Sequence, residues 1–212
     1  MKQSKISNNV IRRLPRYLRR LDELIAKGQE RVSSSELGNQ LGLTSSQIRQ
    51  DLSCFGGFGQ QGYGYNVVSL REAIAGILGI DKGHSAILVG VGNIGRALLG
   101  NFDFENWGYK VCSAFDTNPD RIGETYNGVP VLDDAQLESY LSENPIDVAV
   151  LTVPKSVAAV AAKKLADCGV KAIWNFTNVE ITVPKSDIII ENMHFSDSLL
   201  SLSYHISHPE EI

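Results

Sequence analysis

A glycine motif in the middle of the chain could bind a dinucleotide. Gly90, Gly92 and Gly95 form a GxGxxG pattern that follows an apolar run and opens a helical pattern. Such glycines allow a tight turn and a close approach of the pyrophosphate, which then lies at the helix N-terminus. Asp116 ends the next apolar run, 21 residues after Gly95. A carboxylate there can accept hydrogen bonds from the adenosine ribose hydroxyls, and no arginine adjoins it to favour a 2′-phosphate.

A second set of residues, nearer the N-terminus, could read DNA. Ser33–Glu36 and Thr44–Gln47 each have the spacing in which a hydroxyl caps a helix and the acid or amide reaches back. Two short helices in succession have the proportions of a helix-turn-helix. The second helix exposes Arg49 and Gln50, which can pair with guanine and adenine, respectively, in the major groove. Similar helices also serve as packing or protein-binding units, and that alternative stays open.

Residues before and after the predicted helix-turn-helix could contact the DNA backbone. Glycines alternate with aromatic residues over 56–65, which predicts a β-hairpin that would form the wing. Basic residues before the first short helix, and hydroxyls at the start of the second, can contact phosphate. The candidate DNA-binding residues are Arg12, Arg13, Arg16, Thr44, Ser45, Ser46, Arg49, Gln50, Phe58 and Gln60.

Charge divides the chain into two parts. Residues 1–83 hold 12 Lys and Arg against 7 Asp and Glu, whereas residues 84–212 hold 8 against 17. The basic part suits a polyanion. No apolar run approaches the ~20 residues of a membrane span, so we expect a cytoplasmic protein with no membrane partner. The isolated cysteines Cys54, Cys112 and Cys168 predict neither a disulfide framework nor a metal site.

The elements that must position these residues form two domains and a tail. Residues 1–83 predict a winged helix-turn-helix domain with a linking helix, which begins at the capping box Ser69–Glu72. Residues 84–195 alternate apolar runs with helical patterns, which predicts an α/β, Rossmann-like, doubly wound parallel sheet. We expect strands at 86–91, 111–115, 148–153 and 172–176, and helices at 94–102, 134–142 and 156–168.

Residues 196–212 predict a C-terminal helix. The apolar side chains of this helix have no obvious packing partner within one chain. Leu199, Leu200, Leu202 and Tyr204 supply this apolar surface. A contact between subunits would bury it.

The sequence offers only poor candidates for the catalytic residues that an NAD-dependent enzyme needs. Hydride transfer requires a proton-transfer group and a substrate anchor. The four histidines lie in the linker, before the last helix or in the tail, and the acidic part holds only two arginines, one of them within the glycine motif's helix. We therefore expect cofactor binding without catalysis. A dehydrogenase, and a CoA- or nucleotide-binding module that assembles with partners, remain as alternatives.

Motifs from both parts follow one another in a fixed order. They are Pro15–Leu18, Gln47–Ser53, Phe55-Gly56 with the glycine-rich hairpin, Gly90–Gly95 with Phe115-Asp116, and Asn175-Phe176. In this order they resemble the Rex family of redox-sensing transcriptional repressors. The resemblance implies a homodimer whose winged-helix domains bind palindromic operator DNA and whose Rossmann domains bind NADH or NAD⁺. It also implies repression when NADH is scarce and release from DNA by NADH.

The resemblance assigns roles by position. It places Arg49 and Gln50 in the major groove and Arg16 near the DNA backbone and the domain interface. It implies that the final helix is exchanged between subunits and packs beside the partner's cofactor. The implied cofactor-binding residues are Gly90, Val91, Gly92, Asn93, Ile94, Gly95 and Asp116, with Thr152, Val153, Pro154, Asn175 and Phe176 toward the nicotinamide.

The chain departs from that family pattern at three places. Many relatives have lysine where this chain has Gln50, and an amide favours adenine where an ammonium favours guanine or phosphate. Relatives often carry a tyrosine after the phosphate-binding helix, where this chain reads 101–103 Asn-Phe-Asp, and an acid near the start of the last helix, where it reads 194–197 His-Phe-Ser-Asp. These departures leave the operator preference and the interdomain switch contacts open.

Overall fold

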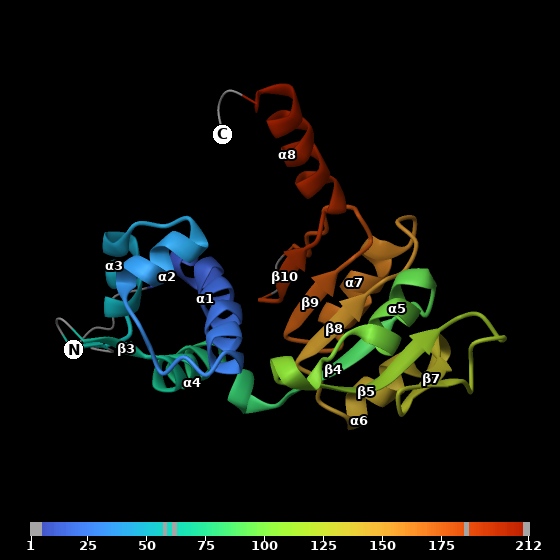
Figure 1. Ribbon diagram of the computed structural model, residues 1–212. Helices are drawn as coiled ribbons and strands as arrows, with labels where there is room; N and C mark the ends of the chain where they lie inside the picture. The colour runs from blue at the N-terminus through green and yellow to red at the C-terminus, as the bar shows by residue number, and fades with distance from the viewer. Residues whose placement is uncertain (1–5, 57–58, 61–62, 185–186, 210–212) are drawn as a thin grey trace. The chain divides into compact units, whose positions relative to one another are not determined.

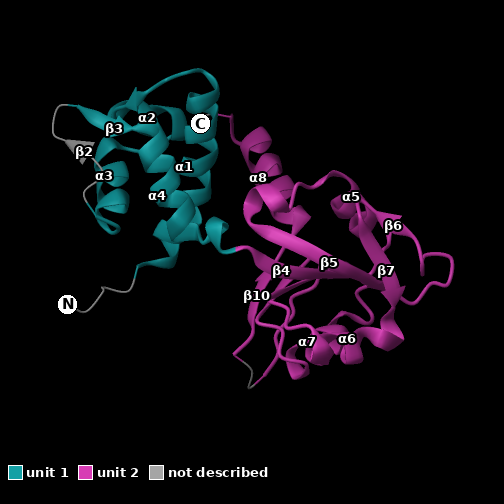
Figure 2. Cartoon of the chain, turned by 90° about the horizontal axis from the view of Figure 1, so that it is seen from below, with its two compact units in different colours: residues 1–82 teal, residues 83–212 magenta. Residues whose placement is uncertain are grey.

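The structure is a computed structural model that describes residues 6–56, 59–60, 63–184 and 187–209. The chain forms two compact units, residues 1–82 and 83–212, which Figure 2 shows in separate colours. The division lies between Lys82 and Gly83, whereas the sequence predicted the boundary between residues 83 and 84.

The described part of the N-terminal unit consists of four α-helices and a small antiparallel sheet. Helix α1 begins at the N-cap Ser7, whose side chain accepts from the Val10 N–H. Ser33 and Thr44 cap the next two helices, as the sequence predicted, by accepting from the N–H groups of Glu36 and Gln47. The helices are α1 (Asn8–Ala26), α2 (Ser34–Leu41), α3 (Ser45–Ser53) and α4 (Val67–Leu78), followed by the 3-10 helix η1 (Ile80–Lys82).

The linking helix α4 begins earlier than expected. Its cap is Asn66, whose side chain accepts from the Ser69 N–H at 2.9 Å, so the predicted capping box at Ser69 is wrong. Asn66 also ends the strand β3, and a residue in extended conformation with a short polar side chain suits both positions. The sheet has the order β1-β3-β2, with β1 (Arg31–Val32), β2 (Gly59–Gln60) and β3 (Gly64–Asn66).

The C-terminal unit is built on a seven-stranded sheet in the order β10-β9-β8-β4-β5-β7-β6 (Figure 1). All neighbours are parallel except β6 and β7. The chain turns from β4 toward one edge of the sheet and from β8 toward the other, which opens a crevice at the carboxyl ends of these two strands. The strands are β4 (His84–Val89), β5 (Tyr109–Asp116), β6 (Thr125–Tyr126), β7 (Val129–Asp133), β8 (Val148–Leu151), β9 (Ala172–Asn175) and β10 (Ile189–Asn192).

Helices cover the sheet on both faces (Figures 1 and 2). Helices α6 and α7 pack over a core that includes Phe115 and Leu151, and α5 packs on the opposite face, over a core that includes Leu88 and Val150. The α-helices are α5 (Asn93–Asn101), α6 (Leu137–Glu143), α7 (Ala158–Asp167) and α8 (Phe195–Ser207), and the 3-10 helices are η2 (Glu105–Trp107) and η3 (Asp134–Gln136). Within the described ranges, no helix is long and apolar enough to cross a membrane.

One part of the sheet's α5 face is hollow. The described residues between β9 and β10 contain no helix that could cover the sheet there. A cavity of about 450 Å³ with an almost wholly apolar lining lies at this place. Phe102, Phe104, Trp107, Val150 and Trp174 are among the residues that line it.

Candidate dinucleotide cleft and DNA-reading surface

The backbone packing of the turn after β4 explains two of its three glycines. Gly90 has a φ of +96°, and a Cβ there would lie 2.9 Å from the Thr152 carbonyl group. A Cβ on Gly95 would lie 2.2 Å from the carbonyl oxygen of Gly90. Both glycines therefore allow α5 to begin close against the end of β8.

The third glycine faces open space. A Cβ on Gly92 would meet no atom within 4 Å, and Gly92 is the N-cap of α5 without a side-chain hydrogen bond to the helix. The first N–H groups of a helix have no partner within the helix and carry its positive dipole end. This end of α5 therefore suits a pyrophosphate.

The Asp116 carboxylate lies at the carboxyl end of β5 and is held in place by two backbone groups. It accepts from the Val91 N–H at 2.5 Å and from the Asn118 N–H at 2.7 Å. A carboxylate offers about four acceptor positions, so two of them remain for a ligand. The hydrogen bond to Val91 joins this carboxylate to the glycine turn, so the predicted ribose acceptor lies beside the predicted pyrophosphate site.

A cleft of about 790 Å³ joins these features. Its volume is in the range typical of sites for cofactors and drug-sized ligands. Of the predicted cofactor residues, the cleft is lined by Gly90, Gly92, Asn93, Ile94, Asp116, Thr152, Val153 and Pro154. Lining residues from the loop after β5 and from α6 and α7 were not predicted, among them Thr117, Leu137, Val157, Val160 and Lys164. Thr117 directly follows β5, and that position was the available signal, whereas Val160 and Lys164 lie inside α7, where the sequence offered none.

Four predicted cofactor residues lie outside this cleft lining. Val91 and Gly95 are buried within the turn. Asn175 is 1% exposed, and its amide donates to the Val179 carbonyl and Asn192 Oδ1 and accepts from the N–H and hydroxyl of Thr177. A direct contact of Asn175 with a cofactor is therefore a wrong prediction, because its hydrogen-bonding capacity is used within the fold. Phe176 packs on Trp174, with ring centroids 4.5 Å apart.

The outer face of α3 carries the predicted base-reading residues. Arg49 and Gln50 are exposed, while Ile48 and Leu52 are buried. The Arg49 guanidinium donates to the Ser34 hydroxyl of α2 at 3.1 Å and to the Ser46 hydroxyl at 3.2 Å. These contacts hold the arginine at the surface shared by α2 and α3.

The other predicted DNA-binding residues are placed in different ways. Thr44 accepts from the Gln47 N–H as the cap of α3, and Ser45 is half-buried beside it. Arg12 is exposed on α1, and Arg16 donates to the Leu41 carbonyl at 2.6 Å. Gln60 is the last residue of β2, and Phe58 lies outside the described residues.

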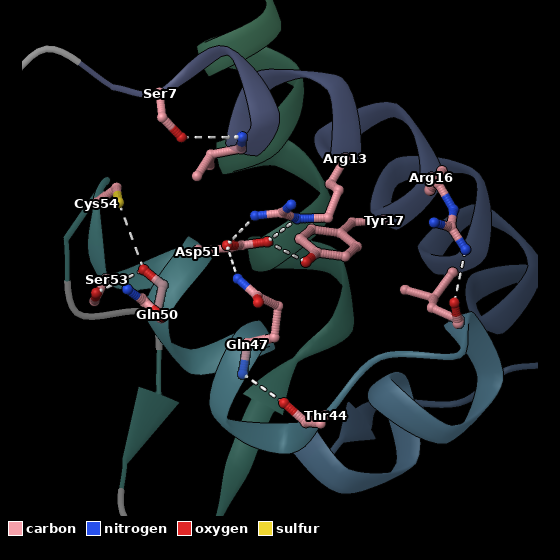
Figure 3. A network of polar contacts seen from close by, with 12 residues as sticks. Ser7, Arg13, Arg16, Tyr17, Thr44, Gln47, Gln50, Asp51, Ser53 and Cys54 are labelled. Atoms are coloured by element: carbon pink, nitrogen blue, oxygen red, sulfur yellow. Dashed lines mark hydrogen bonds and ion pairs between the residues drawn. The ribbon is translucent and has the colours of Figure 1, made fainter.

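Arg13 is the clear departure from the predicted DNA contacts. Its Nε and Nη2 donate to the two carboxylate oxygens of Asp51 at 2.6 and 2.7 Å (Figure 3). Asp51 is fully buried and also accepts from the Tyr17 hydroxyl at 2.5 Å and from Gln47 Nε2 at 2.9 Å. Arg13 as a DNA contact is therefore corrected to an internal ion pair between α1 and α3. The available signal was an acid on the buried side of a short helix.

The surroundings of Asp51 keep it charged. Burial raises the pKa of this carboxyl, but the hydrogen bonds from Arg13, Tyr17 and Gln47 outweigh burial and hold the pKa below its usual value. Burial, and then the neighbouring carboxylate, raise the pKa of the Tyr17 hydroxyl above its usual value. The cluster thus pairs an ionised aspartate with a neutral tyrosine at neutral pH.

Acid should remove the contribution of this carboxylate to stability. Because the folded pKa of Asp51 is depressed, its stabilisation is present above the unfolded pKa of about 4 and is lost as pH falls through the folded value. We expect Asp51→Asn to lower the free energy of unfolding by about 3 kcal/mol near neutral pH, and by progressively less as the pH falls below about 4. Urea unfolding followed by circular dichroism measures this. A difference independent of pH would contradict it.

Comparison with known proteins joins the two sites in one family. The family described as "Putative DNA-binding protein N-terminus" matches residues 5–53, and "CoA binding domain" matches residues 81–179. Similar solved structures include RSP, a Rex-family repressor, in complex with β-NAD⁺ and operator DNA (TM-score 0.90, 45% identity, 98% of this chain and 95% of that chain). RSP in complex with β-NADH is also similar (TM-score 0.90, 42% identity, 98% of this chain and 97% of that chain).

The similarity to curated proteins covers nearly the whole chain. The redox-sensing transcriptional repressor Rex of Clostridium beijerinckii is 49% identical over 209 residues, which are 99% of each chain. The Rex of Thermoanaerobacter pseudethanolicus is 46% identical over 99% of this chain and 93% of that one. These relatives are repressors and not enzymes, which sets aside the two alternatives, a dehydrogenase and a CoA- or nucleotide-binding module that assembles with partners. The chain belongs to the Rex family of redox-sensing transcriptional repressors.

Proposed function

We propose that the N-terminal unit binds palindromic operator DNA and that NADH in the cleft of the C-terminal unit releases it. The observation that carries this proposal is the presence, in one chain, of the glycine turn joined to Asp116 and of α3 with Arg49 exposed. The relative RSP, solved with operator DNA, NAD⁺ and NADH, supports both parts.

The cleft offers separate groups of residues for the pyrophosphate, the adenosine ribose and the nicotinamide of NADH. The N-terminus of α5, at Gly92 and Asn93, would bind the pyrophosphate, and Asp116 would accept from the adenosine ribose. Thr152, Val153 and Pro154 would face the nicotinamide. The oxidised ring carries a positive charge, and transfer of a charge from water to an apolar surface is costly. This site therefore favours the neutral reduced ring.

The release requires two states of a dimer. NADH must bind the DNA-free arrangement more tightly than the DNA-bound one, since only differential affinity shifts the equilibrium. We place the dimer contact at α8, where Leu199, Leu200 and Leu202 are 66%, 67% and 58% exposed, with α8 exchanged between subunits. A two-fold dimer presents two copies of α3, which fits a palindrome. The proposed location is the cytoplasm, with the DNA.

The side chains differ from the family pattern at two positions, the residue after α5 and the residue before α8, and both make contacts within the C-terminal unit. Phe102 follows α5 and packs against Trp174, with ring centroids 5.6 Å apart. His194 Nε2 lies 3.0 Å from Glu180 Oε2 at the start of α8. The switch between the two states therefore uses a different set of side chains at these positions.

The direct test is an anisotropy titration of labelled palindromic DNA, selected from random sequence by the protein itself, at fixed salt. We expect specific binding, release by NADH and little release by NAD⁺. Binding that ignores both nucleotides would leave a DNA-binding protein with another ligand. Absence of specific binding would refute the proposal. Equal affinities for NADH and NAD⁺ in calorimetry would refute the preference for the neutral ring.

Asp116→Ala should separate the two sites. Loss of hydrogen bonds to a charged acceptor costs about 1.5 to 3 kcal/mol, so we expect NADH affinity to fall about 10- to 100-fold while operator affinity is unchanged. NADH fluorescence and DNA anisotropy measure the two affinities on one preparation. Asp120→Ala is the matched control: it removes an exposed carboxylate that lies outside the cleft lining, and it should change neither affinity. Unaltered NADH binding by Asp116→Ala would remove the carboxylate from the site.

A further inference from the structure

We propose that Arg13 is a positioning residue for DNA recognition, which fixes the orientation of α3 through the buried carboxylate of Asp51. The proposal rests on the proposed DNA-binding function and adds a determinant of its specificity. Arg13 would contact no DNA. It would act through Arg49 and Gln50, which lie on the same short helix as Asp51.

The geometry links the inner face of α3 to its outer face. Successive helical residues are rotated by about 100°, so Asp51 lies about 200° around the helix from Arg49. The carboxylate points inward, where it is 1% exposed, and the arginine points outward. A rotation of α3 about its axis would therefore move Arg49 and would also pull the carboxylate away from α1.

The ion pair is suited to resist such a rotation. The Arg13 guanidinium contacts both carboxylate oxygens, at 2.6 and 2.7 Å, and two parallel hydrogen bonds fix direction as well as distance. Tyr17, one helical turn further along α1, donates to the same carboxylate. A buried carboxylate that lost these donors would remain desolvated without compensation, so other orientations of α3 are disfavoured.

Arg13 and its neighbour Arg12 provide a matched pair. Both are arginines of α1, but Arg12 is exposed, whereas the Arg13 side chain is 23% exposed and bonded to Asp51 through two of its nitrogens. A phosphate contact adds to the salt dependence of binding, because it releases counterions, and its loss reduces the slope of log K against log salt by about 0.9. A positioning residue does not contribute to that slope.

The experiment compares Arg13→Gln with Arg12→Gln in the full chain. Affinities are measured for the selected palindrome and for a scrambled duplex over a series of salt concentrations. For Arg13→Gln we expect operator affinity to fall about 10-fold or more, affinity for scrambled DNA to change little, and the slope to stay as in the wild type. For Arg12→Gln, as the phosphate-contact control, we expect equal weakening on both duplexes and a smaller slope.

Two results would overturn the positioning role. A reduced slope with Arg13→Gln would mean a direct phosphate contact. Equal loss on both duplexes at an unchanged slope would mean that Arg13 supports the fold of the unit in general and not the preference for the operator. Tyr17→Phe, which removes one donor and keeps the ring, serves as the milder second variant and should show the same loss of preference to a smaller degree.

Hydrogen exchange tests, in the absence of DNA, whether the Arg13–Asp51 ion pair holds α3 in place. In Arg13→Gln the amides of α3 should exchange faster, while those of α5, in the other unit, should be unchanged. Unchanged protection of α3 would overturn the inference on its own. A wild-type protein that binds operator and scrambled DNA equally would refute the proposed function instead, and the exchange result would still decide whether Arg13 holds α3.

Discussion

Gly95→Ala is expected to weaken NADH binding about 100-fold or more, which corresponds to about 2.7 kcal/mol. The added Cβ would lie 2.2 Å from the Gly90 carbonyl oxygen and 3.0 Å from Thr152 Oγ1. Backbone cannot yield as a flexible side chain does, so the turn must move away from α5. The N–H groups at Gly92 and Asn93 would then no longer converge on one pyrophosphate. Fluorescence titration with NADH measures the loss.

The same variant should still bind operator DNA, because the turn lies in the other unit. It should therefore remain on DNA at NADH concentrations that release the wild type. Gly100→Ala is the matched control, since Gly100 is in the same helix and a Cβ there meets nothing within 4 Å. It should bind NADH normally. Normal NADH affinity in Gly95→Ala would show that the turn tolerates displacement.

Arg49→Ala is expected to weaken operator binding by about 1 to 3 kcal/mol, roughly 5- to 150-fold. Its guanidinium is exposed on α3 and held by Ser34 and Ser46 in a position from which it can meet a base edge. NADH affinity should be unchanged. DNA anisotropy and NADH fluorescence on the same sample measure both quantities, and a simultaneous loss of the two would indicate a misfolded protein.

Arg49→Lys distinguishes base reading from charge attraction. Lysine keeps the positive charge but lacks the planar fork that contacts two acceptors of one guanine. We expect this variant to retain affinity for scrambled DNA and to lose preference for the operator. If Arg49→Lys bound the operator like the wild type, the contact would be to phosphate.

The sequence predicted those parts of the fold that depend on local signals. The caps at Ser33 and Thr44, the turn at Gly90 and the buried strands β4, β5, β8 and β9 could be found because each is encoded within a few neighbouring residues. The strands β7 and β10 were not among the expected ones. Pro130 interrupts the β pattern of the first, and the second is a short, partly exposed edge strand.

The wrong predictions for single site residues concern side chains whose hydrogen-bond partners are distant in the sequence. Arg13 looked like a free cation because its partner, Asp51, is 38 residues away, and a sequence pattern cannot show that two helices meet there. Asn175 was assigned to the cofactor by the resemblance to the Rex family, and it is the last residue of β9, at the edge of the sheet where Rossmann sites lie. Its partner Asn192 belongs to a strand that was not predicted.

The hollow on the α5 face gives the protein an internal optical probe. The chain has two tryptophans, Trp107 and Trp174, and both line that one cavity. Tryptophan emission shifts to shorter wavelength when water leaves the indole, so the intrinsic spectrum of the unlabelled protein reports on a single location. Any segment or subunit that fills the hollow would shift the emission maximum and change the accessibility of the two indoles to a quencher. Filling of the hollow can thus be followed without a dye.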